Sequence, residues 1–167
     1  MANNKSVPAR SVALGGVLAA LAVAAMALGT IIPITTYVCP MFCALLLQVV
    51  LKTCGRRMAW AWYGAVSLLA VLLAPDKEAA AVFLFLGYYP IVKPWLDSRK
   101  IPWLWKGLLF NGAIGLMYFL LIRLLGLEAL VQEFTGMGLG MLALLLVLGN
   151  VTFFLLDRLL GMQRRRK

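Results

Sequence analysis

The sequence predicts an all-α, polytopic membrane protein with six transmembrane helices and both termini in the cytoplasm. The first observation is composition, because 63% of the 167 residues are apolar and only 13% are charged, unlike a soluble domain. The second is that several apolar stretches reach or approach the roughly 20 residues that a helix needs to cross a bilayer. The third is that basic residues concentrate in alternate connections. We therefore expect a single transmembrane domain over residues 1–167.

Hydropathy and helix-breaking residues divide the chain into six spans. The first span follows Lys5 and Arg10, but it is too long for the apolar region of a signal peptide and has no convincing cleavage site. We therefore expect it to remain in the mature protein. The second and third spans are the shortest. The predicted spans are residues 11–32, 37–51, 58–73, 79–95, 103–125 and 134–155.

The basic residues determine the expected orientation. If the N-terminus is cytoplasmic, all 16 Lys and Arg residues except Lys77 and Arg123 lie on the inner side, as the positive-inside rule requires. Those inner cations would meet the anionic headgroups of the lipid bilayer, at about 1 kcal/mol each. The net charge of +10 is thus explained by membrane topology, and no nucleic-acid partner is expected.

The residues of an enzyme or a metal site are not evident. The chain has no histidine and no acidic pair within a span, so it lacks a base that would activate a nucleophile. Its three cysteines, Cys39, Cys43 and Cys54, are fewer than the four ligands of a usual zinc site. No Gly-rich phosphate-binding loop is present. We expect a non-enzymatic protein without a cofactor or a metal.

The first span carries a stripe of small residues. Gly16, Ala20 and Ala24 recur every four residues, which places them on one helix face. Such a face lets another helix approach closely. The stripe either packs within the same bundle or docks a separate membrane subunit.

The segment "GTIIPITTYVCP", residues 29–40, follows the first span. It has two prolines and no charge, and irregular backbone is not tolerated against lipid. We expect a loop that covers the bundle or lines a cavity, with Thr35 and Tyr37 as candidate contacts to a solute. The alternative is a plain tight turn.

Four polar residues fall near mid-membrane when depth is counted at about 1.5 Å per residue. They are Tyr88 and Tyr89 in the fourth span, Asn111 in the fifth and Asn150 in the sixth. They either bond to one another across helices or bind a solute at the floor of a cavity. Pro90 is expected to kink the fourth span beside the tyrosines.

Tyr118 and Arg123 lie nearer the outer end of the fifth span. An intramembrane cation is a candidate functional site, and Arg123 would attract a carboxylate or a phosphate. Alternatively, Arg123 reaches the headgroups or pairs with Glu128.

This outline resembles the S components of energy-coupling factor transporters. The similarity rests on "ARSVALGGVLAALAVAAMALG", residues 9–29, with its small-residue stripe, and on the following "IIPITTY". It implies a substrate-binding subunit that captures a small solute such as a vitamin from outside. It also implies a transmembrane coupling subunit and two cytoplasmic ATPases as partners. The segments "FLGYYPIVKP" and "KGLLFN" also resemble uncharacterised membrane proteins of Gram-positive bacteria, which implies a bacterial plasma membrane.

Two function classes remain open, and a third is less favoured. The chain is either the substrate-binding subunit of an importer or a structural or accessory subunit of another membrane complex. A bound solute at mid-depth would favour the first, and a filled interior would favour the second. An enzyme that acts on lipid is less favoured because no base is available.

Overall fold

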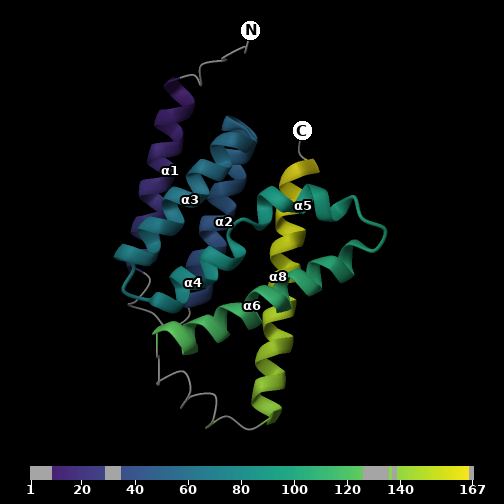
Figure 1. Ribbon diagram of the computed structural model, residues 1–167. Helices are drawn as coiled ribbons and strands as arrows, with labels where there is room; N and C mark the ends of the chain where they lie inside the picture. The colour runs from purple at the N-terminus through teal and green to yellow at the C-terminus, as the bar shows by residue number, and fades with distance from the viewer. Residues whose placement is uncertain (1–8, 29–34, 126–135, 137–138, 166–167) are drawn as a thin grey trace. The chain divides into compact units, whose positions relative to one another are not determined.

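The computed structural model describes residues 9–28, 35–125, 136 and 139–165. Within these ranges the chain forms helices and no strands, which confirms the all-α prediction. Figure 1 shows the helices in chain order. They are α1 (Ala9–Leu28), α2 (Thr35–Cys54), α3 (Arg56–Leu73), α4 (Lys77–Leu86), α5 (Tyr89–Asp97), α6 (Pro102–Leu125) and α8 (Leu139–Arg165).

Five helical stretches in the described part of the chain are long and apolar enough to cross a membrane. The third helix, α3, has 18 residues but is not among them, because Arg56 and Arg57 at its start lower its mean hydropathy. Several membrane-length helices are therefore present, while the number of six and the cytoplasmic position of both ends stay predictions. The five stretches are Ala9–Ala27, Thr36–Cys54, Lys77–Asp97, Pro102–Arg123 and Ala143–Met162.

Two helix boundaries differ from the sequence prediction in ways that bear on function. The second helix begins at Thr35, so the described end of the predicted loop, from Thr35 to Pro40, is helical. Pro40 stands in the second turn, where it removes the hydrogen bond to the Thr36 carbonyl but leaves the rest of the helix intact. Residues 29–34 of that loop lie outside the described residues. The last helix continues to Arg165, ten residues beyond the predicted end of the sixth span.

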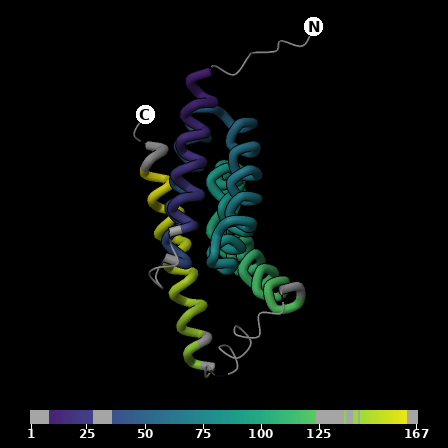
Figure 2. Tube along the Cα trace, turned by 90° about the vertical axis from the view of Figure 1, so that its left-hand side faces the viewer, coloured from purple at the N-terminus to yellow at the C-terminus, as the bar shows by residue number. Residues whose placement is uncertain are grey.

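The chain divides into two compact units, Met1–Pro94 and Trp95–Lys167. The first unit is a bundle in which α2 contacts α1, α3 and α4, and α3 contacts both α1 and α4. Figure 2 shows α1 running alongside its neighbours in this bundle. The core of the bundle consists of buried apolar side chains from all four helices. They include Ala22, Met26, Cys43, Leu47, Val50, Ala59, Trp62, Val66, Ala70 and Phe83.

The interface between α1 and α2 is antiparallel and uses all three cysteines. The Cys39 thiol donates to the Ala25 carbonyl at 3.3 Å, and the Cys43 thiol donates to the Ala22 carbonyl at 3.6 Å. At the other end of α2, the Cys54 thiol donates to the carbonyl of Ser11 at 3.4 Å. The cysteines are free thiols, and they serve as small, weakly polar residues at a close helix interface.

The packing of α3 on α1 is close at Gly15. The Trp62 indole N–H donates to the Gly15 carbonyl at 2.9 Å. A Cβ at Gly15 would lie 3.3 Å from the Met58 methyl group, so the Met58 side chain would have to shift by a few tenths of an ångström. A single glycine, Gly55, joins α2 to α3 with a φ of 86°, a left-handed conformation that glycine adopts without strain.

The second unit contains the end of α5, α6 and α8. Phe110 of α6 stacks on Phe153 of α8 with ring centroids 4.7 Å apart. In Figure 1 the axes of α6 and α8 cross steeply. Phe110 and Phe153 are both buried, whereas much of the apolar surface of both helices is exposed.

Candidate functional site

The outer end of the first unit, as the predicted topology orients it, joins the start of α2 to the start of α4. Asp76 is the N-cap of α4: one carboxylate oxygen accepts from the Ala79 amide at 3.0 Å, and the other accepts from the Thr36 hydroxyl at 2.7 Å. An N-cap carboxylate satisfies an amide that has no partner within the helix. Asp76 therefore links the two helices at this end.

Tyr37, a predicted contact to a solute, belongs to the same cluster. Its hydroxyl donates to a carboxylate oxygen of Glu78 at 3.0 Å, and its ring is 49% exposed. The neighbouring Thr35 is the first residue of α2, and its side chain lies outside the described part. Contact of Thr35 and Tyr37 with a solute stays a prediction.

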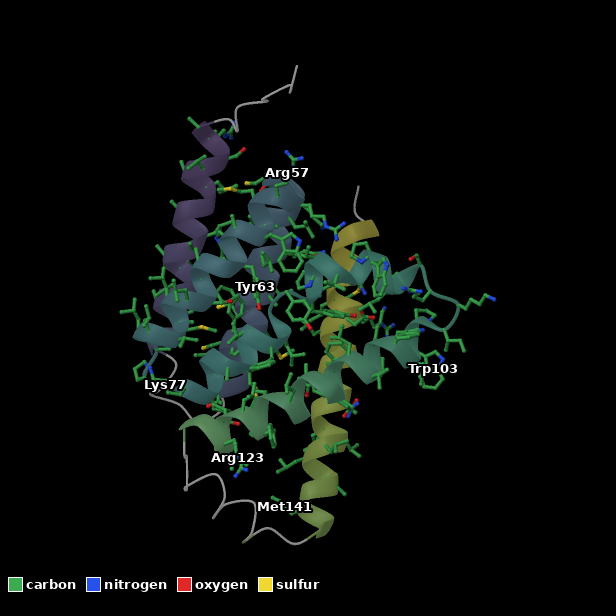
Figure 3. All side chains as sticks on the ribbon, viewed as in Figure 1. Arg57, Tyr63, Lys77, Trp103, Arg123 and Met141 are labelled. Carbon is green, nitrogen blue, oxygen red and sulfur yellow. The ribbon has the colours of Figure 1, made fainter. Side chains whose placement is uncertain are left out.

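Lys77 caps the end of α3. Its ammonium donates to the carbonyls of Val71 at 2.9 Å and Ala74 at 3.0 Å. Carbonyls in the last turn of a helix lack intrahelical partners and attract a cation. Lys77 thus stabilises the turn between α3 and α4. Figure 3 shows Lys77 at that turn.

The predicted fourth span is divided at Gly87 and Tyr88 into two helices, α4 and α5. This break lies next to Pro90, where the sequence predicts a kink. Pro90 has no N–H for the Leu86 carbonyl. The Tyr63 hydroxyl donates to the nearby Leu84 carbonyl, which satisfies a backbone group next to the break. A Cβ at Gly87 would lie only 2.4 Å from the Phe83 carbonyl oxygen, so the end of α4 requires glycine.

The two tyrosines after Gly87 have different surroundings. Tyr88 is half-buried and its ring stacks on Trp60, with centroids 6.4 Å apart and an interplanar angle of 17°. Tyr63 meets Tyr88 edge-on, with centroids 6.0 Å apart. By contrast, Tyr89 is fully buried, and the Lys93 ammonium lies 6.0 Å from its ring centroid. Tyr88 is the more accessible candidate of the pair.

Asn111 and Asn150, in the second unit, bond to each other. Each amide donates to the carbonyl oxygen of the other, at 3.0 and 3.1 Å. Each also donates its second N–H to the carbonyl four residues earlier in its own helix, Gly107 at 2.8 Å and Leu146 at 2.9 Å. Both donors of each amide are therefore used. The structure brings the two asparagines together as one α6–α8 contact, while the two tyrosines belong to the first unit.

Arg123 is exposed in the last turn of α6, and Tyr118 is half-buried one and a half turns earlier. Figure 3 shows Arg123 at the opposite end of α6 from Trp103. The alternative partner, Glu128, lies outside the described residues. Contact of Arg123 and Tyr118 with a solute stays a prediction.

An ion cluster in the second unit was not predicted from the sequence. The Lys106 ammonium lies 2.5 Å from a carboxylate oxygen of Asp97 and 2.9 Å from one of Asp157. Lys106 is buried, and a buried charge requires such partners. The available signal was that Asp97 and Asp157 are the two acidic residues on the predicted inner side. The sequence pattern does not identify Lys106 as their common partner.

The small-residue stripe of α1 lies on the exposed face of that helix. Gly16, Ala20 and Ala24 are exposed, whereas Ala22 and Met26 are buried in the bundle. A Cβ at Gly16 would meet nothing within 4 Å. The stripe therefore does not pack within the first unit, and α1 uses other residues for its contacts with α2 and α3.

Within the first unit, Tyr37 and Tyr88 offer aromatic rings and hydroxyl groups, and within the second unit Arg123 offers an exposed charge in addition to the bonded amides of Asn111 and Asn150. Such groups bind and orient a solute or a partner helix. Comparisons with protein-family models, curated proteins and solved structures give no match for this chain.

Proposed function

We propose that this chain is a non-enzymatic, membrane-embedded subunit of an importer that captures a small solute from the outer side. Energy would come from a transmembrane coupling subunit with cytoplasmic ATPases, in the plasma membrane of a bacterium. The observation that carries the proposal is the exposed face of α1, where Gly16, Ala20 and Ala24 leave room for a partner helix. Small residues permit the close backbone approach that drives helix association in lipid.

The candidate solute contacts support the same proposal. Tyr88 stands at a broken helix, and discontinuous membrane helices are frequent sites of solute binding. Tyr37 and Arg123 are exposed near the ends of α2 and α6. Within the first unit, Tyr37 and Tyr88 would contact an aromatic group of a solute, and within the second unit Arg123 would attract an anionic one.

The experiment is co-purification of the tagged chain from its own membranes, with Ala20→Leu as the test variant. The matched control is Ala65→Leu, since Ala65 is an exposed alanine on α3. We expect the unaltered chain and Ala65→Leu to retain a larger membrane subunit and ATPases, and Ala20→Leu to lose them. Equal retention by both variants would refute docking through α1.

A structural or accessory subunit of another membrane complex is the second candidate. It is favoured by the reciprocal bonds of Asn111 and Asn150, because amides that satisfy each other have less need of a solute. This candidate predicts a partner without ATPases and no solute that survives purification. The subunit masses in the same experiment distinguish it from an importer.

A further inference from the structure

The turn between α5 and α6 presents aromatic rings and cations together. We call residues 95–105 the Trp–Arg turn. The Arg99 guanidinium lies 4.1 Å from the Trp95 ring centroid and 5.7 Å from that of Trp105. The Ser98 hydroxyl and amide both donate to the Trp95 carbonyl, which fixes the backbone that carries Arg99.

The rings of this turn remain on the surface. Trp95 is 51% exposed, Trp105 is 44% exposed and Trp103 is 65% exposed. Figure 3 shows Trp103 projecting from the start of α6. Amphipathic indole rings are favoured at the level of lipid headgroups, so this surface suits the interface between hydrocarbon and water.

The charge that the turn presents is positive. Arg99 and Lys100 are both exposed, and the carboxylate of Asp97 is bonded to the buried ammonium of Lys106. The planar guanidinium carries five N–H donors in a fixed arrangement. Those donors match two oxygens of a phosphate group.

We propose that the Trp–Arg turn is a binding site for one anionic phospholipid of the bilayer. Arg99 holds the phosphate, Lys100 adds attraction for the net negative headgroup, and the indole rings contact the glycerol and upper acyl region. An exposed arginine without flanking rings would attract the same lipids only as part of a diffuse layer. The site does not depend on which of the two candidate functions is correct.

The test is native mass spectrometry of the purified chain titrated with phosphatidylglycerol or phosphatidylcholine in detergent micelles. We expect the first phosphatidylglycerol to bind about fivefold or more tightly than phosphatidylcholine, the ratio that about 1 kcal/mol per interfacial cation gives. Arg99→Gln should reduce the preference about fivefold and leave only the part that Lys100 supplies. Arg99→Lys should cause only part of this loss, because the charge remains but the planar donors are lost.

The matched control is Arg57→Gln, which removes an exposed charge at the start of α3. We expect it to keep the preference for phosphatidylglycerol. An equal loss in Arg57→Gln and Arg99→Gln, or full retention in both, would overturn the proposal. Inorganic phosphate at millimolar concentration is the second arm, and displacement of the lipid by it would reveal a site for soluble anions instead.

Discussion

At the scale of single residues, Gly87 determines how the first unit accommodates a broken helix. A Cβ added at this position would lie 2.4 Å from the Phe83 carbonyl oxygen and 2.7 Å from two carbons of the Phe83 ring. Real Cβ atoms do not approach backbone oxygen so closely. The absence of a side chain lets α4 end where Tyr63 reaches the Leu84 carbonyl, and that geometry presents Tyr88 to Trp60.

Gly87→Ala should therefore destabilise the protein. We expect a loss of about 1–3 kcal/mol, the usual cost of overpacking, measured by reversible unfolding in detergent. The control is Gly112→Ala, since a Cβ at Gly112 of α6 would meet nothing within 4 Å. Alanine there should be neutral or stabilising by up to about 1 kcal/mol. Equal effects of the two substitutions would contradict the close contact at Phe83.

The amide pair of Asn111 and Asn150 gives a second prediction at this scale. A double-mutant cycle with Asn111→Ala and Asn150→Ala should show a coupling energy of about 0.6 kcal/mol, and at most about 1.7 kcal/mol. The coupling arises because each amide bonds the other. Additive effects in unfolding measurements would show that the two amides act independently.

At the scale of elements, Lys106 connects three helices of the second unit. It lies on α6 and bonds Asp97 at the end of α5 and Asp157 on α8. The cluster places a shared ammonium between two carboxylates at one end of the unit. Removal of the ammonium would leave two carboxylates close together, of which Asp157 is partly buried and Asp97 is more exposed.

Lys106→Met should cost about 3 kcal/mol of unfolding free energy, the lower end of the range for breaking a buried ion pair. The control is Lys100→Met, because Lys100 is exposed and an exposed charge contributes about 1 kcal/mol or less. Combining Lys106→Met with Asp97→Asn and Asp157→Asn should recover part of the loss. No recovery would show that the methylenes of Lys106 matter more than its charge.

Sequence reasoning located elements better than it located contacts between them. Apolar length found the helices, and Pro90 indicated the break near Tyr88, because both signals are local. The helices α2 and α8 extend beyond the predicted spans, because a helix continues past its apolar stretch as long as its backbone hydrogen bonds continue. The contacts of Asp76 with Thr36 and of Asp157 with Lys106 join residues distant in sequence, so no local pattern reveals them.

At the scale of the whole molecule, the distribution of basic residues predicts the orientation. The turn between α3 and α4 should face outward, and the Trp–Arg turn should face the cytoplasm. Pro75 and Ser98 are exposed residues of these two turns. They provide positions at which a single cysteine reports the side of the membrane.

In a background with Cys39→Ala, Cys43→Ala and Cys54→Ala, a membrane-impermeant maleimide should label Pro75→Cys in intact cells. It should label Ser98→Cys only after permeabilisation. The reason is that Lys and Arg in short connections resist translocation. Labelling of both positions in intact cells, or the reverse pattern, would refute the proposed topology.

Native mass spectrometry of the gently purified complex tests the central claim most directly, because it weighs subunits and a bound solute together. The importer proposal predicts one copy of this chain with a larger membrane subunit and two ATPases, and a small solute that is lost on Tyr88→Ala. A complex without ATPases and without a solute would contradict the proposal.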